Sequence, residues 1–329
     1  MERQLMTPYR GYGITVPFDR VPLHAQKDRI AELASLGYTD VWSAETDGAD
    51  AFTPLVLASQ WAPTLRLGTA IVPAFTRGPA VIAQSVAAMA QAAPGRFVLG
   101  IGTSSDVIVG RWNGMSFNEP YKRLRDTVRF VRAALTGEKV TESYETFSIK
   151  GFKLSALPEA PVPILIAALR EGMLNLAGRE GDGAIINWLS AEDVARVAPI
   201  VSAHGDDKEI VARIFVVPSE DTETVRAQAK FAIAAYLNVP VYAAFHEWLG
   251  RGPQLQGMWD AWKAGDRPAA LAAIPDEVVD QLIVHGSYEQ CRAHIQRYVE
   301  NGVTTPALAV LGMAGVDTEE AVRQLTPRE

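Results

Sequence analysis

Short apolar runs alternate along the chain with longer segments of helical period. This is the pattern of parallel βα units, in which a buried strand is followed by a helix that packs over it. Eight runs are predicted to be strands, at residues 11–16, 39–43, 66–73, 96–101, 162–167, 183–187, 210–217 and 306–311. Eight such units without a break in composition favour an α/β fold of the closed (β/α)8 TIM-barrel type over a doubly wound sheet with a second domain.

The segments between the runs predict helices and two insertions. Helices are expected at residues 22–36, 79–93 and 118–135. Residues from about 140 to 155 alternate polar and apolar positions, which predicts a β-hairpin insertion. Residues 239–286 form an oversized segment before the last strand, predicted to be a helical insertion. The whole chain, residues 1–329, is therefore expected to be one barrel domain with these two insertions.

Composition excludes several classes of function. The net charge of −7 provides no basic face for a nucleic-acid backbone, so no nucleic-acid partner is expected. No apolar run reaches the roughly 18 residues of a membrane-spanning helix, and no secretory signal is evident. The single cysteine, Cys291, can form neither an internal disulfide nor a cysteine metal cluster, which favours the cytoplasm. No His, Cys or carboxylate spacing predicts a metal site.

The barrel prediction tells us where chemistry should lie. Active sites of these barrels are built from the loops after the strands, at the C-terminal face. The loop after the fourth strand begins Gly100-Ile101-Gly102-Thr103, a near miss to a dinucleotide fingerprint that is weak by itself. Its exposed backbone N–H groups can still hold a phosphate, although a plain βα turn explains the small residues equally well.

Three stretches carry a recognisable resemblance. They read LGTAIVPAFTRGPAVIAQ from Leu67, GRFVLGIGTSS from Gly95 and PVPILIAALREGMLNLAGREGDGAIINWLS from Pro161. They resemble consecutive signature regions of the luciferase-like monooxygenase superfamily, and look closest to its branch that uses the deazaflavin coenzyme F420. The resemblance runs from about Tyr12 to Leu311 and implies a (β/α)8 barrel with the cofactor ring in its mouth.

The resemblance also implies cofactor-binding positions. A hallmark of the deazaflavin branch is a non-prolyl cis peptide in the third strand, which backs one face of the ring and would fall at Ala70-Ile71. The phosphate-bearing tail would lie over the loops after the fourth and fifth strands. The implied cofactor-binding residues are Ala70, Ile71, Val72, Gly102, Thr103, Ser104, Ala168, Leu169 and Arg170.

Departures from the family pattern bear on catalysis. The sugar-phosphate dehydrogenases of this branch have an Asp-His pair after the second strand, where this chain has Glu45-Thr46, and a glutamate where it has Ser105. Neither hydroxyl can replace the imidazole base at neutral pH, so oxidation of a sugar phosphate is not expected. Glu45 is the first candidate for a proton donor or orienting group, because Asp47 or Asp50 could raise its pKa by like charge. A hydrogen-bonded residue that fixes the loop after the second strand is an equal alternative.

The catalytic candidates are Glu45, Thr46 and His246. His246 belongs to the 239–286 insertion, which begins on the side of the mouth. The same insertion holds Trp248, Trp259 and Trp262. These indoles could form a lid over a flat ring, although burial of an extra helical layer is the simpler explanation for any one of them.

The expected function is reversible hydride transfer between coenzyme F420 and a small organic substrate. One alternative is an FMN-dependent monooxygenase of the same superfamily, and another is a cofactor-binding relative without catalysis, suggested by the missing His and Glu. A homodimer is expected by analogy, through the small-residue helices at residues 52–61 and 87–93.

Overall fold

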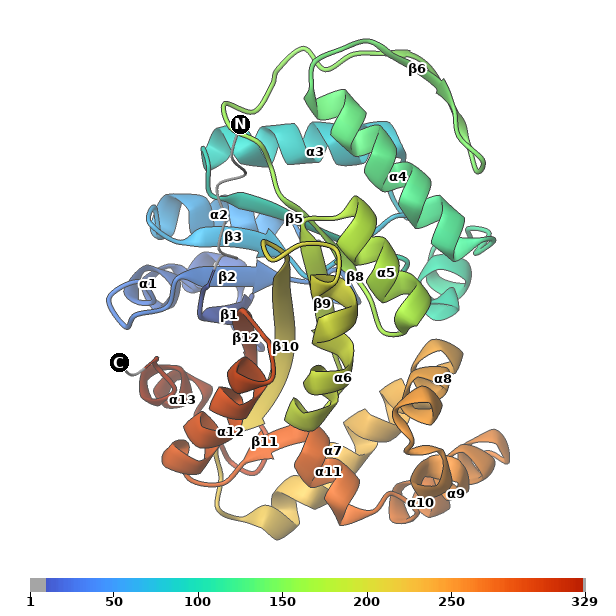
Figure 1. Cartoon of the computed structure of the whole chain (residues 1–329). Helices are drawn as coiled ribbons and strands as arrows, with labels where there is room; N and C mark the ends of the chain where they lie inside the picture. Colours follow the sequence, from blue (N-terminus) through green and yellow to red (C-terminus); the bar gives the residue numbers. More distant parts are fainter. Residues whose placement is uncertain (1–9, 328–329) are drawn as a thin grey trace.

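The computed structural model describes residues 10–327. Within them, parallel strands close into a ring in which each strand pairs with the next and the last pairs with the first (Figure 1). In order around the ring the strands are β1 (Gly13–Val16), β2 (Asp40–Ser43), β3 (Arg66–Thr69), β5 (Phe97–Gly102), β8 (Ile164–Ala167), β9 (Gly183–Asn187), β10 (Glu209–Val217) and β12 (Thr305–Val310). The predicted TIM barrel is confirmed, and each predicted apolar run contains a strand of the ring.

The third run differs from a single strand. It splits into β3 and the short β4 (Val72–Pro73), and both pair with β5. A further strand, β11 (Ile283–His285), pairs with the C-terminal end of β10 and was not predicted. Only three residues long, β11 lies within the segment expected to be helical.

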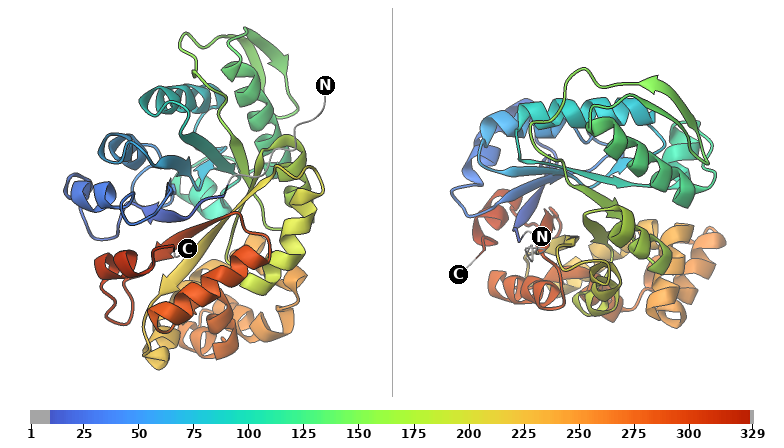
Figure 2. Two further views of the ribbon diagram at one scale, coloured as in Figure 1. Left: turned by 60° about the vertical axis from the view of Figure 1, so that its left-hand side comes forward. Right: turned by 45° about the horizontal axis from the view of Figure 1, so that its top comes forward.

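Helices surround the ring and cover its outer face (Figures 1 and 2). They are α1 (Lys27–Glu32), α2 (Thr53–Trp61), α3 (Pro79–Ala92), α4 (Pro120–Leu135), α5 (Glu171–Glu180), α6 (Ala191–Ser202), α7 (Thr222–Leu237), α12 (Tyr288–Glu300) and α13 (Thr318–Gln324). Two shorter turns of helix, Leu23–Ala25 and Val107–Trp112, lie in the loops after β1 and β5. The first predicted helix is therefore shorter than expected and starts with a separate turn.

One large side chain fills the middle of the barrel. Trp42 of β2 is buried with Val98, Leu165, Ile185, Val211 and Ala307 in an interior cluster. The neighbouring strand makes room for the indole with Gly68, where a Cβ atom would lie 2.2 Å from the Trp42 ring. These apolar side chains form a floor across the barrel. A barrel of this kind is a packed core and not a pore.

Below this floor, charged groups close the N-terminal end of the barrel. Arg66 lies 2.6 Å from a carboxylate oxygen of Glu209 and 3.1 Å from one of Asp40. Glu209 also accepts a hydrogen bond from Thr305. Burial raises the pKa of Glu209, and the positive charge of Arg66 opposes that rise. These residues are the first of their strands, so the cluster fixes the end of the barrel opposite the expected site.

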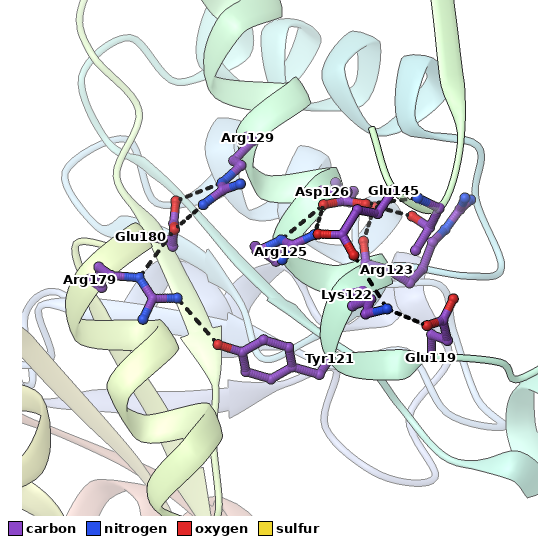
Figure 3. A network of polar contacts seen from close by, with 12 residues as sticks. Glu119, Tyr121, Lys122, Arg123, Arg125, Asp126, Arg129, Glu145, Arg179 and Glu180 are labelled. Atoms are coloured by element: carbon purple, nitrogen blue, oxygen red, sulfur yellow. Dashed lines mark hydrogen bonds and ion pairs between the residues drawn. The ribbon is translucent and has the colours of Figure 1, made fainter. Parts of the chain in front are cut away.

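The predicted hairpin insertion is present as the antiparallel pair β6 (Val140–Ser143) and β7 (Ser148–Phe152). Its turn is attached to helix α4: the backbone N–H and hydroxyl of Thr146 both donate to the buried carboxylate of Asp126. Arg125 adds an ion pair with Glu145, at 2.7 Å (Figure 3). Further along the same helix, Arg129 pairs with Glu180 of α5. The hairpin therefore packs over α4 at the edge of the barrel.

The second insertion forms a separate helical layer outside the barrel (Figure 2). It consists of α8 (Pro240–Leu249), α9 (Gly252–Lys263), α10 (Arg267–Ala272) and α11 (Asp276–Leu282), which pack against α7 around an apolar core that also includes Phe215 of β10 and Ala309 of β12. Trp259 donates its indole N–H to the carbonyl of Leu237, and Trp248 stacks beside Phe245. Trp259 and Trp262 thus pack in this layer, and Trp248 packs against the main core of the barrel, so the prediction of a lid is not supported. Within residues 10–327, no helix is long and apolar enough to cross a membrane.

Candidate active site

The C-terminal end of the barrel is lined by small side chains. Because side chains alternate along a strand, the inward positions beyond the buried floor can be identified from it. They include Thr15, Ala70, Gly102, Ala167 and Asn187. Thr15, Ala167 and Asn187 are the partly exposed residues of otherwise buried strands. The interior is therefore open to solvent at this end, and the small residues leave space that Trp42 occupies one level below.

The predicted non-prolyl cis bond between Ala70 and Ile71 is present. Both residues are partly exposed and pack against the interior cluster, whereas Val72 is fully buried. The segment is held from both sides, because Ala70 donates its N–H to Ser43 and the carbonyl of Ile71 accepts from the N–H of Glu45. The third strand and the loop after β2 thus meet at the rim of the mouth.

Gly102 packs closely between this segment and β8. A Cβ atom at this position would lie 2.8 Å from the Ala167 Cβ and 3.0 Å from the Ile71 Cδ1. A side chain at position 102 would therefore have to displace Ile71 or Ala167, so the absence of a side chain lets β4 and β8 approach each other closely at the rim of the mouth.

Two adjacent loops are suited to an anionic tail. After β5, Ser104 has a left-handed backbone with a φ of 61°, which turns the chain sharply after Thr103. After β8, helix α5 begins behind Arg170 without any side chain capping its first turn. The first amides of a helix have no intrahelical partner and attract anions. Arg170 is exposed, and its side chain forms no ion pair or hydrogen bond with residues 10–327. Ala168 is buried at the start of this loop and Leu169 is partly buried.

Glu45 lies in a different environment from the one expected. Its carboxylate is 2.8 Å from the guanidinium of Arg77, which also lies 3.5 Å from Asp50. The N–H of Ala51 and the hydroxyl of Thr76 complete its contacts. The prediction of a like-charge environment is therefore wrong, because Arg77 stands between the two carboxylates. Thr46, the next residue, is exposed and donates a hydrogen bond to Asp47.

His246 is fully buried in helix α8. Its ring packs edge-on against Phe245 and lies near the backbone of Trp188, the residue after β9. Burial lowers its pKa to about 3, and the positive charge of Arg251 adds to this shift. A neutral, enclosed imidazole on the outer side of the barrel wall does not contact a substrate in the mouth, so its placement does not support a role as a catalytic base.

The buried imidazole predicts how stability depends on pH. Because the pKa of His246 falls from 6.5 in the unfolded chain to about 3 in the fold, the unfolded chain takes up the proton first. Stability is thus fully present above pH 6.5 and decreases as the pH falls towards 3. We expect His246→Leu to reduce the loss of unfolding free energy between pH 7.5 and 5 by about 2 kcal/mol. Urea unfolding at the two pH values measures this.

The control is His24→Leu, which removes an exposed imidazole. His294, whose pKa burial lowers to about 4, remains in both variants and gives the same residual slope. Equal pH dependence in His246→Leu and the wild type would contradict the assignment.

Sequence reasoning missed the charged member of the mouth. Arg213 of β10 is two residues after the interior Val211 and therefore also points inward. It pairs in register with Asn187 of β9, whose amide lies 3.3 Å from the hydroxyl of Tyr242. The signal was present in the sequence, because a lone arginine interrupts the apolar run of β10.

Within residues 10–327, no group of three or more His, Cys, Asp or Glu side chains could hold a metal ion.

Small side chains line the mouth of the closed barrel, and the loops beside it present free backbone N–H groups to an anion. These features define a barrel enzyme that binds its ligands at the C-terminal face of its strands. Residues 1–305 match the family model described as luciferase-like monooxygenase, and the chain belongs to that family. It is 27% identical over 303 residues to a 5,10-methylenetetrahydromethanopterin reductase from Methanolobus tindarius, covering 89% of this chain and 92% of the relative.

Solved structures show the same fold. The coenzyme F420 dependent tetrahydromethanopterin reductase from Methanopyrus kandleri superposes with a TM-score of 0.79 at 16% identity, over 97% of each chain. A monooxygenase from Streptomyces bottropensis superposes with a TM-score of 0.68 at 19% identity, over 96% of each chain. The structural likeness is thus higher to the F420-dependent reductase than to this monooxygenase.

Proposed function

We propose that this protein is a coenzyme F420-dependent oxidoreductase that transfers a hydride between the deazaflavin and a small organic substrate. The observation that carries the proposal is the Ala70-Ile71 cis bond at the C-terminal end of the barrel, where Ala70, Ile71 and Ala167 are all partly exposed. The F420-dependent reductases among its relatives support the choice of cofactor.

The residues of the mouth divide into two groups by the part of the cofactor that they would hold. Ala70, Ile71, Val72 and Gly102 would border the ring. Thr103, Ser104, Ala168, Leu169 and Arg170 would hold the anionic tail, through backbone N–H groups and one bidentate guanidinium. When bound, the deazaflavin supplies the carbon that accepts or donates the hydride.

The protein's own contribution is positioning and exclusion of water. We propose that Glu45 orients the loop after β2, since its N–H binds the Ile71 carbonyl while its carboxylate is locked to Arg77. Thr46 then presents its hydroxyl at the edge of the mouth as a hydrogen-bonding group for substrate. His246 would act only indirectly, as a positioning residue behind Trp188.

Cofactor binding by the purified chain tests the proposal. We expect F420 to bind with a Kd at least about tenfold lower than that of FMN, which corresponds to about 1.4 kcal/mol. Quenching of deazaflavin and flavin fluorescence gives both constants under identical conditions. Turnover of a panel of alcohols, imines and enones with F420 then separates an enzyme from a binding protein.

Two outcomes would contradict the proposal. Tighter binding of FMN, with oxygen consumption by the reduced complex, would favour the flavin monooxygenase alternative, which the likeness to the Streptomyces enzyme keeps open. Tight binding of F420 without turnover of any substrate would favour a relative that only binds the cofactor.

We also propose an oligomeric state and a cellular compartment for this protein. Helices α2 and α3 pack side by side and expose Val56 and Val81, so we propose a homodimer formed through this face. Sedimentation that finds only monomer at micromolar concentration would reject it.

Cys291 is free and buried, and we propose the cytoplasm as the compartment. Localisation of a fluorescent fusion tests this.

A further inference from the structure

Arg213 is unusual among the inward-facing residues of the mouth because it is both large and charged. It is the partly exposed member of β10, whose other residues are buried. Its neighbours in register are Asn187 on β9 and Ala307 on β12. The side chain therefore rises from the floor of the barrel into the space that the small residues leave open.

The charge of this side chain is not neutralised by the protein. Arg213 forms no ion pair and no hydrogen bond with residues 10–327, and its Nε atom is buried without a partner. The carboxylate of Asp19 acts on it electrostatically without forming an ion pair. Burial lowers the pKa of Arg213, although a guanidinium stays protonated at neutral pH. A partly buried cation without a counter-ion is costly, which indicates a missing anionic partner.

The surroundings hold the guanidinium in place. Its central carbon lies 5.2 Å from the centre of the Phe215 ring, whose centre in turn lies 4.2 Å from that of Trp188, with the two rings tilted by 35°. Trp188 has a left-handed backbone with a φ of 52°, which is rare for a bulky residue and is characteristic of functional sites. The hydroxyl of Tyr242 and the amide of Asn187 supply two more polar groups. The result is a cation with aromatic walls and neutral hydrogen-bonding groups beside it.

From this arrangement we infer that Arg213, with Asn187 and Tyr242, forms a subsite in the barrel mouth that binds an oxyanion of the substrate, in the first place a carboxylate. The inference rests on the proposed function, because it assigns the substrate class of that same mouth. A planar carboxylate matches the fork of a guanidinium and can form two parallel hydrogen bonds with it. The substrate would be a small organic acid whose reacting carbon lies a few bonds from the carboxylate.

The test uses the full chain without cofactor, so that it does not depend on F420. Benzoate, an aromatic carboxylate, and inorganic phosphate are titrated separately while tryptophan fluorescence is recorded, since Trp188 lies in the wall of the subsite. We expect saturable binding of benzoate, a Kd at least tenfold higher in Arg213→Gln, and partial recovery in Arg213→Lys. Phosphate binding tighter than benzoate, and equally dependent on Arg213, would retain the subsite but assign it to phosphorylated substrates.

Arg170→Gln is the matched control, because it removes an exposed guanidinium from the proposed tail site. It is expected to weaken F420 binding at least tenfold and leave benzoate binding unchanged. Arg213→Gln is expected to weaken benzoate binding and leave F420 binding unchanged. Benzoate and phosphate binding that are absent in the wild type, or unchanged in Arg213→Gln, would overturn the inference. Loss of F420 affinity in Arg213→Gln without any anion binding would also overturn it, by placing Arg213 against the cofactor. Failure of F420 to bind the wild type, with anion binding intact, would instead count against the proposed function alone.

Discussion

Gly100→Ala is expected to lower the free energy of unfolding by about 3 kcal/mol or more, because the barrel wall has no space for one added methyl group. A Cβ atom at Gly100 would lie 1.8 Å from the carbonyl oxygen of Thr69 and 2.4 Å from the Ile185 Cδ1. The contact with Thr69 is the more serious one, since a backbone atom cannot rotate away. The Thr69 hydroxyl also exchanges two hydrogen bonds with the backbone of Gly100, at 2.8 Å each, and separation of β3 from β5 would break both.

Urea unfolding followed by circular dichroism measures this effect. The matched control is Gly172→Ala in helix α5, where an added Cβ would meet nothing within 4 Å. Alanine is the better helix former, so this variant is expected to be as stable as the wild type or up to about 1 kcal/mol more stable. A Gly100→Ala protein with the unfolding midpoint of the wild type would show that β3 and β5 are not packed as described.

The fold could be predicted from the sequence largely because buried parallel strands give a strong signal. Each strand of the ring is apolar on both faces, outward against helices and inward against the barrel core, so it appears as a continuous apolar run. The strand Gly183–Asn187 was predicted with these bounds. Others differed by one or two residues at their ends, as at β10, which begins at Glu209. The residue at which a strand ends depends on hydrogen bonds to its neighbouring strands, and the pattern of apolar residues carries no information about these bonds.

The extra helical layer could be predicted only as an insertion. Helices α8 to α11 bury their apolar sides against α7 and the ends of β10 and β12, through contacts that the pattern of apolar runs does not contain. Without knowledge of that partner, an aromatic residue on such a helix could equally belong to a lid. The hydrogen bond from Trp259 to the Leu237 carbonyl decides for packing, and it joins residues of two different helices.

The candidate site was predicted in outline, while its charges were not. The family resemblance located the Ala70-Ile71 bond and the loops beside it. The pairing of Glu45 with Arg77 joins residues 32 positions apart, so a local reading found only the neighbouring carboxylates. Arg213 was overlooked for a different reason: one polar residue in an apolar strand is ordinary in an open sheet. In a closed barrel the side chain must point either into the barrel or towards the helices. Arg213 lies two positions after the inward-facing Val211 on the same strand, so it points into the barrel.

Ala167→Trp is expected to raise the Kd for F420 at least about 100-fold, a loss of about 2.8 kcal/mol of binding free energy. Ala167 is inward-facing and partly exposed at the end of β8, and it borders the same space as Gly102. An indole at this position would occupy the opening where the ring is proposed to lie. Because the side chain can extend towards solvent, the fold itself should tolerate it, and the thermal unfolding midpoint should change by only a few degrees.

Ala264→Trp serves as the control for this variant, since it places the same side chain at an exposed position at the end of α9, away from the barrel strands. It should bind F420 like the wild type. If the unfolding midpoint of Ala167→Trp fell sharply, the smaller Ala167→Leu would repeat the test with less added volume. Wild-type affinity in a stable Ala167→Trp protein would mean that the ring does not enter the mouth. The geometric basis of the proposed function would then be wrong.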